Sequence, residues 1–314
     1  MADIICGVDI SSQTLDVRIG RDGELHRFAN TEAGIAELTT ICRRNQVDLV
    51  VMEATGGYER LPFGLLWAAK IPVAIVNPRS VRRFAEAMGI LEKTDSIDCK
   101  VIVWYAETKR IQASPPASAT QTRLTALVVR LRQLTDLQVT QKNQRRLVTE
   151  PDVQDSFTAV LQTIAQQMRA LETAIVALID ADPLWAKLNA AFREIKGVAG
   201  RTVARLLADL PEIGTLSGKA VAKLNGVAPI ARDSGQKTGR RLVRGGRESV
   251  RSILYMVGQV VRRYDPDFKS FYETLKAKGK PHKVIRIALA RKLLVRLNAK
   301  ARDARQALAE AQAA

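Results

Sequence analysis

Apolar residues in the first third of the chain form short runs that are typical of strands in an α/β domain. Residues 3–9 and 48–53 are almost wholly apolar until each run closes on an acidic side chain. The predicted strands cover residues 3–9, 14–20, 24–29, 48–53 and 72–76. The predicted helices cover residues 31–44, 59–69, 79–88 and 95–109. Three strands followed by alternating helices and strands predict an α/β domain with a mixed sheet over residues 1–112.

The pattern becomes helical after the Ser-Pro-Pro-Ala-Ser segment at residues 114–118, which we interpret as a linker. Two long amphipathic helices are expected at residues 120–149 and 152–180, and they predict a helical hairpin or coiled-coil arm over residues 113–182. A third, all-helical domain with several glycine turns is expected over residues 183–314. The stripe that defines the first arm helix consists of Leu124, Leu127, Leu131, Leu134 and Leu137.

Charge is distributed very unevenly between these predicted domains. The 314 residues carry 49 basic and 32 acidic side chains, a formal net charge of +17. Residues 1–110 have a net charge of −1, residues 111–182 are neutral, and residues 183–314 carry +18. The last domain therefore favours a polyanion such as double-stranded DNA as partner.

Several classes of protein are disfavoured by composition. The most apolar stretch, residues 61–76, is interrupted by Lys70 and Pro72, so no membrane span is expected. The first residues lack a basic segment typical of secretion signals, which predicts a cytoplasmic protein. The two histidines, His26 and His282, have no neighbouring metal ligand or triad partner in sequence, which argues against a zinc hydrolase. The chain also has three cysteines without paired spacing, predicted to be buried thiols: Cys6, Cys42 and Cys99.

Four acids lie where strands end or a helix begins. Asp9 and Glu53 close the two apolar runs, while Asp95 and Asp98 fall in the first turn of a helix that Thr94 is expected to cap. Taken singly, Asp9, Asp95 and Asp98 each have an ordinary explanation as a turn, edge or solvated residue, whereas Glu53 closes an apolar run and needs a partner. Together they supply the hard oxygen ligands that Mg²⁺ or Mn²⁺ prefers, and two such ions can catalyse phosphoryl transfer.

A second candidate site lies between Asn225 and Gly258. Pro229 and Gly235 bound a loop that holds Asp233 and Ser234, followed by a basic stretch and a helix from about residue 247. A serine in such a loop can attack phosphorus beside arginines, although a Ser-Gly turn is usually only a turn. The candidate nucleic-acid-binding residues are Lys237, Arg240, Arg241, Arg244, Arg247 and Arg251.

Two glycine turns and a basic tail complete the third domain. Residues 195–200 are similar to half of a helix-hairpin-helix element that binds phosphate, and residues 219–226 offer a second such turn. A tight packing turn explains them equally well. The tail at residues 276–305 predicts a helix with one basic face, which is either solvated or in contact with nucleic acid; the residues that indicate it are Ile285, Leu289, Lys292 and Arg296.

The segments GVDISSQTLDV, VMEATGGYE, VNPRSVRRFAEAMG and KTDSIDCKVI resemble the RuvC-like, RNase H-fold domain of IS110 family insertion-sequence transposases and the related Piv/MooV DNA invertases. The acids of that family follow a D-E-D-D pattern, which Asp9, Glu53, Asp95 and Asp98 match. Its catalytic serine lies in a Ser-Gly loop, which Ser234 matches. The resemblance implies a magnesium-dependent DNA transposase or recombinase, a bridge RNA that pairs with donor and target DNA, and a dimer or tetramer.

Three other interpretations follow from the same residues. In a RuvC-like nuclease or junction resolvase the acids would activate water, and Ser234 would be only a turn residue. In an actin-like sugar kinase or ATPase the first strand would precede a phosphate loop, but the later Asp-Gly loop is missing. A helix-hairpin-helix DNA-binding protein without enzymatic activity would leave the four acids unexplained.

Overall fold

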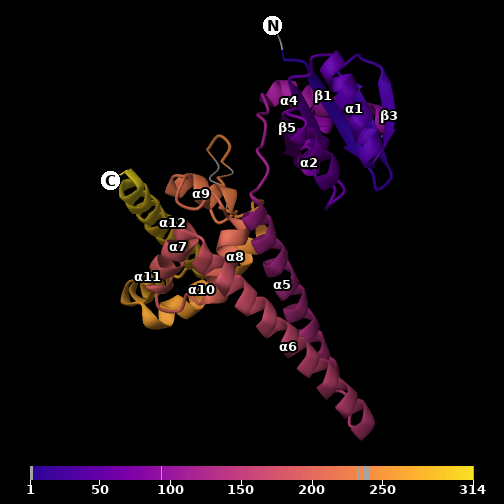
Figure 1. Cartoon of the computed structure of the whole chain (residues 1–314). Coiled ribbons are helices and arrows are strands. Elements are labelled where there is room, and N and C mark those ends of the chain that lie inside the picture. The colour runs from indigo at the N-terminus through magenta and orange to yellow at the C-terminus, as the bar shows by residue number, and fades with distance from the viewer. Residues whose placement is uncertain (1–2, 93, 232, 237–238, 240, 314) are drawn as a thin grey trace. The chain divides into compact units, whose positions relative to one another are not determined.

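The computed structural model describes residues 3–92, 94–231, 233–236, 239 and 241–313. The chain forms two compact units, Met1–Ala117 and Ser118–Ala314 (Figure 1). The arm helices belong to the second unit because one hydrophobic cluster runs from Leu124 to Ala301. No helix among the described residues is long and apolar enough to cross a membrane.

The N-terminal unit is built on a mixed five-stranded sheet with the order β3-β2-β1-β4-β5. Strand β2 is antiparallel to β1 and β3, whereas β1, β4 and β5 are parallel neighbours. This order, with only the second strand reversed, is the topology of the RNase H-like fold, so the predicted mixed α/β sheet is confirmed. The strands are β1 (Ile5–Ile10), β2 (Thr14–Ile19), β3 (Leu25–Ala29), β4 (Leu49–Glu53) and β5 (Val73–Val76).

Helices cover both faces of this sheet, because successive side chains of a strand point to opposite faces. Val50 and Met52 join the cluster that includes side chains of α1 and α2. Leu49 and Val51 join the cluster that includes α3 and α4. The near-continuous apolar run of β4 is therefore explained by burial on both sides. The helices are α1 (Glu32–Arg44), α2 (Arg60–Ala68), α3 (Pro78–Ala87) and α4 (Asp95–Lys109).

Helix α4 packs unusually closely on β1 at Gly7. A Cβ atom at Gly7 would lie 2.6 Å from the carbonyl oxygen of Cys99 and 2.8 Å from Val103 Cγ2. The thiol of Cys99 donates to the backbone oxygen of Asp16 at 3.1 Å. The absence of a side chain at Gly7 thus lets the first half of α4 approach the strand that carries Asp9.

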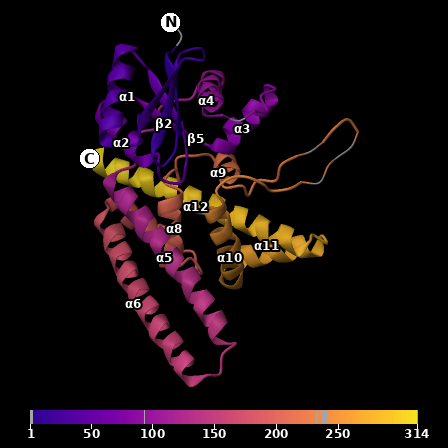
Figure 2. The same ribbon diagram turned by 90° about the vertical axis from the view of Figure 1, so that its right-hand side faces the viewer.

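The second unit opens with the hairpin of α5 (Ala119–Arg145) and α6 (Pro151–Ala181). The two helices lie side by side, and their far ends project beyond the other helices of the unit (Figures 1 and 2). The predicted leucine stripe is buried at Leu124, Leu131 and Leu134, but Leu137 is exposed near the projecting end. Near the other end, the amide of Gln121 donates to the backbone oxygen of Leu207 at 3.1 Å.

The described remainder of the second unit is mostly helical, and the loop between its third and fourth helices holds an isolated bridge between Ile230 and Leu242. The last helix is central to its core, because Leu289, Leu293 and Leu297 are fully buried. The helices are α7 (Pro183–Arg193), α8 (Gly200–Asp209), α9 (Gly218–Leu224), α10 (Glu248–Tyr264), α11 (Pro266–Ala277) and α12 (His282–Ala313).

Two sequence patterns of this unit have a packing role in the structure. Gly197, in the first glycine turn, has a φ of 102°, and a Cβ there would lie 3.1 Å from the backbone nitrogen of Val261 in α10. On α12, Lys292 Nζ donates to the backbone oxygen of Asp267 at 2.8 Å, and Arg296 pairs with Asp265 at 2.7 Å. The turn and these two cations of the predicted basic face thus join helices within the unit.

Candidate catalytic site and nucleic-acid interface

Asp9 and Glu53 lie at the same edge of the sheet. Strands β1 and β4 are parallel, and their register pairs Val8 with Met52. Asp9 and Glu53 each follow this pair by one residue, so the two acids occupy neighbouring positions at the carboxyl ends of the strands. One Asp9 carboxylate oxygen accepts a hydrogen bond from the backbone nitrogen of Ile10 at 3.0 Å.

Helix α4 brings Asp98 toward this edge. Its neighbour Cys99 is fully buried against β1 and β2, and burial raises the pKa of the Cys99 thiol to about 12. The negative charges of Asp9 and Asp16 contribute to this increase, while a hydrogen bond from the Asp9 backbone and the positive charge of Arg18 oppose it. The start of α4 therefore lies beside Asp9, and Thr94 caps it by accepting from the Ile97 backbone nitrogen at 3.3 Å.

The fourth acid, Asp95, is the first residue of α4, but its side chain lies outside the described part of the chain. Among the described residues, no three His, Cys, Asp or Glu side chains are arranged to hold a metal ion. The structure thus brings Asp9 and Glu53 to one edge and the helix of Asp98 beside them. The four-acid metal site remains a prediction, supported by a donor set made only of carboxylates.

A further acid organises the loop after Glu53. Glu59 Oε2 accepts from the Thr55 hydroxyl at 2.7 Å, from the Thr55 backbone nitrogen at 3.1 Å, and from the Gly57 backbone nitrogen at 2.8 Å. Burial would raise the pKa of Glu59, but these hydrogen bonds lower it below its usual value. Glu59 was not among the residues predicted from the sequence; its signal there is an acid four residues after Thr55 and two after a Gly-Gly pair.

Ser234 lies in the segment between α9 and α10, which we call the serine loop (residues 226–246). Figure 2 shows the described parts of this loop extending away from the helices of its own unit. Ser234 is exposed. Beside it, one Asp233 carboxylate oxygen accepts from the Gly239 backbone nitrogen at 3.0 Å and from Arg241 at 2.6 Å. The Arg241 guanidinium lowers the pKa of Asp233.

The base of the serine loop is held by direct contact between two glycine turns. Gly226 and Gly246 have φ angles of 63° and 67°, and a Cβ on Gly246 would collide with the backbone nitrogen of Gly226. The Arg247 backbone nitrogen donates to the oxygen of Leu224 at 3.1 Å, next to this contact. The loop therefore starts and ends at nearly the same place.

The six predicted nucleic-acid-binding cations fall into three groups. Lys237 and Arg240 lie outside the described residues. Arg241 and Arg244 are exposed along the serine loop. Arg247 and Arg251 make contacts at the base of the loop instead.

Arg247 and Arg251 contact other protein groups at the base of the serine loop. Arg247 forms a two-point pair with Glu212 at 2.6 and 2.5 Å and donates to the Asp209 backbone oxygen at 3.0 Å. Its guanidinium lowers the pKa of Glu212. Arg251 donates to the backbone oxygen of Gly245. A role for either residue in contacting nucleic acid remains a prediction.

Two family models match this sequence. The model for DEDD transposases of IS110 elements, described as "Transposase", matches residues 6–149. The model described as "Transposase IS116/IS110/IS902 family" matches residues 189–273. Together the matches cover more than half of the chain and define a transposase, an enzyme that cuts and rejoins DNA. The chain belongs to the IS110 family, which confirms the resemblance predicted from its acidic and Ser-Gly motifs.

Similar proteins include the pilin gene-inverting proteins of Moraxella lacunata and Moraxella bovis, each 27% identical over 316 aligned residues and covering 94% of both chains. An uncharacterized 43.6 kDa protein of the insertion element IS110 in Streptomyces coelicolor is 31% identical over 158 residues, which cover 50% of this chain and 37% of that protein. A structure of T. thermophilus RuvC in complex with a Holliday junction substrate is 12% identical, with a TM-score of 0.27, over 36% of this chain and 99% of that one.

Proposed function

We propose that this transposase cuts DNA by attack of the Ser234 hydroxyl on a phosphodiester that the acidic edge of the N-terminal unit helps to activate. The observation that carries this proposal is the position of Ser234. It is exposed on a loop with a firmly closed base, and guanidinium groups lie along the same loop. Exposure lets the hydroxyl reach a bulky substrate, while the closed base limits how far the loop can move.

In the proposed reaction, the Ser234 oxygen loses its proton and forms a bond to phosphorus. The bond between phosphorus and the leaving strand oxygen breaks, and that oxygen takes up a proton. A strand hydroxyl can later attack the serine ester and rejoin the DNA with the same atoms exchanged. Arg241 and Arg244 are placed to balance negative charge on the phosphate during both steps.

Asp9, Glu53, Asp95 and Asp98 are the residues that would hold Mg²⁺ or Mn²⁺. Such an ion, when bound, supplies a Lewis acid that polarises a phosphoryl oxygen. The neighbouring positions of Asp9 and Glu53 support this assignment, as does the close packing of α4 on β1 at Gly7. Within the protein, Glu59 orders the loop after Glu53 and thereby holds this end of β4 in place.

The family resemblance also suggests a bridge RNA and assembly into a dimer or tetramer. Exposed apolar side chains near the projecting end of the arm offer a surface that a second copy of the chain could cover. These residues include Leu137, Val139 and Leu147. The RNA would read DNA sequence by base pairing and leave the basic unit to contact backbones.

The serine mechanism predicts a covalent protein–DNA intermediate. Labelled substrate DNA, incubated with the protein and Mg²⁺ and then denatured, should migrate with the wild-type protein and not with Ser234→Ala. Ser252→Ala, which replaces an exposed serine in α10, should still form the adduct. If Ser234→Ala cleaves DNA at the normal rate, water is the nucleophile and the protein acts as a nuclease instead.

A further inference from the structure

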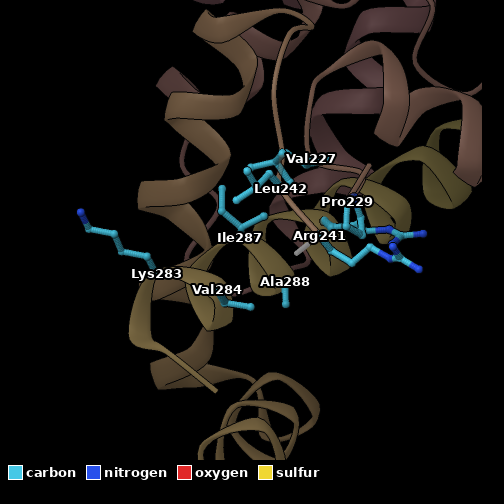
Figure 3. A pocket seen from close by; sticks show the side chains of 10 residues that line it. Val227, Pro229, Arg241, Leu242, Lys283, Val284, Ile287 and Ala288 are labelled. Carbon is cyan, nitrogen blue, oxygen red and sulfur yellow. The ribbon is translucent and has the colours of Figure 1, made fainter. Parts of the chain in front are cut away.

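A pocket of about 430 Å³ lies between the serine loop and the first turns of α12 (Figure 3). Val227, Pro229 and Leu242 line it from the loop. Val284, Ile287 and Ala288 line it from α12. Its volume falls within the range of about 300–1,000 Å³ that is usual for small-molecule sites.

The walls of this pocket are apolar yet open to solvent. Leu242 is 57% exposed and Val284 is 51% exposed. Exposed apolar side chains grouped in one concave place mark a binding site more often than scattered ones do. The proposed attack by Ser234 does not require this pocket, so its apolar walls need another explanation.

Positive charge surrounds the apolar walls. In Figure 3 the Arg241 guanidinium lies on one side of the apolar side chains, and the Lys283 ammonium lies on the other. Arg291 also lines the pocket, and none of the described lining residues is acidic. An apolar centre between cations matches a ligand with a flat apolar body and negative charge on two sides.

A second cavity continues the basic surface. It has a volume of about 560 Å³ and shares Pro229 and Arg291 with the first pocket. Lys219, Lys223 and Arg244 line its far part. A strand whose base occupied the apolar pocket would therefore find further cations for its next phosphates along the neighbouring cavity.

We propose that the apolar pocket holds one unstacked nucleotide of a DNA strand, with its base against Leu242 and Val284 and its flanking phosphates near Arg241 and Lys283. Apolar side chains commonly hold flipped-out bases, and arginine guanidinium groups stack on them. Capture of a base offsets part of the free-energy cost of unstacking it.

The occupant is DNA rather than RNA because of Arg241, and this step rests on the proposed function. Arg241 lines the pocket and also pairs with Asp233, the neighbour of Ser234. A phosphate that contacts Arg241 thus belongs to the strand presented to the serine, which is the strand to be cut. Unstacking the adjacent nucleotide would widen access to the scissile phosphate.

The test compares the affinity of the full-length protein for two fluorescein-labelled DNA duplexes, one fully paired and one with a single unpaired nucleotide, by fluorescence anisotropy. Wild type should bind the second duplex about tenfold more tightly. In the Val284→Asn and Ala288→Phe variants, the ratio of the affinities for the two duplexes should be close to one. Val295→Asn, at another exposed valine of α12 outside the pocket, should keep the wild-type ratio.

Two lysine substitutions, one inside the pocket and one outside it, test whether positive charge at the pocket contributes to binding. Lys283→Gln should reduce the preference for the unpaired nucleotide, whereas Lys276→Gln, an exposed lysine of α11 outside the pocket, should not. Melting curves for all variants show whether each remains folded. An equal affinity of wild type for both duplexes overturns the proposal. An unchanged ratio in Val284→Asn and Ala288→Phe, or tighter binding of the equivalent RNA duplex, also overturns it.

The two proposals fail in different ways. If the Ser234→Ala variant loses the covalent adduct while the pocket variants keep the wild-type ratio of duplex affinities, only the proposal of a nucleotide pocket is wrong. If the pocket variants lose the ratio while Ser234→Ala still forms the adduct, only the serine mechanism is wrong.

Discussion

At the residue scale, Glu59 shows how one carboxylate can organise the approach to the acidic edge. One of its two carboxylate oxygens, Oε2, accepts three hydrogen bonds from Thr55 and Gly57, in the loop that follows Glu53. Gly56 and Gly57 have φ angles of 85° and 144°, which side chains rarely adopt, so the loop conformation depends on glycine and on this carboxylate together.

Replacement of Glu59 by Gln should lower the thermal stability of the N-terminal unit at neutral pH. Because the folded protein has a lowered Glu59 pKa, the stabilising contribution is present above the usual value of 4.5 and is lost as the pH falls through the folded pKa. Thermal unfolding followed by circular dichroism at a series of pH values measures this difference between wild type and variant.

Glu37→Gln, at an exposed position of α1, is the control and should show no such pH-dependent difference. A constant difference between wild type and Glu59→Gln down to a pH well below 4 would contradict the assigned hydrogen bonds.

At the scale of elements, hydrophobic patterning predicted the sheet and its helices closely, because burial on two faces leaves a strong signal in β1 and β4. The partners of the cations were not predictable. Arg247 and Arg296 looked suited to a polyanion, but Glu212 and Asp265 lie more than thirty residues away in sequence and meet them only after folding. The apolar pocket was missed for the same reason, because its walls combine the serine loop with α12.

Two alanine substitutions can distinguish the effect of the Gly226–Gly246 contact from the effect of backbone strain. Gly245 and Gly246 have φ angles of 69° and 67°, but only at Gly246 would a Cβ meet another segment within 4 Å. Alanine at either position costs about 1–2 kcal/mol of strain, and Gly246→Ala adds a collision with Gly226. Gly246→Ala should therefore reduce adduct formation more strongly than Gly245→Ala, in the denaturing-gel assay.

Equal effects of the two alanine substitutions on adduct yield would show that the loop base does not position Ser234. Melting temperatures of both variants establish whether any loss of adduct follows from general unfolding.

At the scale of the whole molecule, charge and candidate chemistry are divided between the two units. Residues 1–117 have a net charge of −1, and residues 118–314 carry +18. The unit with the predicted metal ligands therefore has little charge with which to attract DNA, and the unit with Ser234 supplies it. Membership of the IS110 family was predictable from the motifs, whereas the apolar pocket beside Arg241 required the structure.

The division of charge between the two units predicts which cations control the salt dependence of DNA binding. The double variant Lys219→Gln with Lys223→Gln should reduce the slope of log affinity against log salt concentration by up to about 1.8, at about 0.9 for each phosphate contact. The double variant Arg44→Gln with Lys109→Gln, in the N-terminal unit, should leave the slope unchanged. Anisotropy titrations over a range of salt concentrations measure both slopes, and equal decreases would contradict the assignment.

In the proposed function, the acidic edge and Ser234 act in one reaction. The most direct test is the yield of the serine–DNA adduct, mapped by mass spectrometry, for wild type and for Asp9→Asn with Mg²⁺ and after chelation of the metal. We expect wild type with Mg²⁺ to carry DNA on Ser234, and we expect no such adduct with Asp9→Asn or with the chelated protein. A normal yield of the Ser234 adduct in Asp9→Asn, or an adduct on a different residue in wild type, would contradict it.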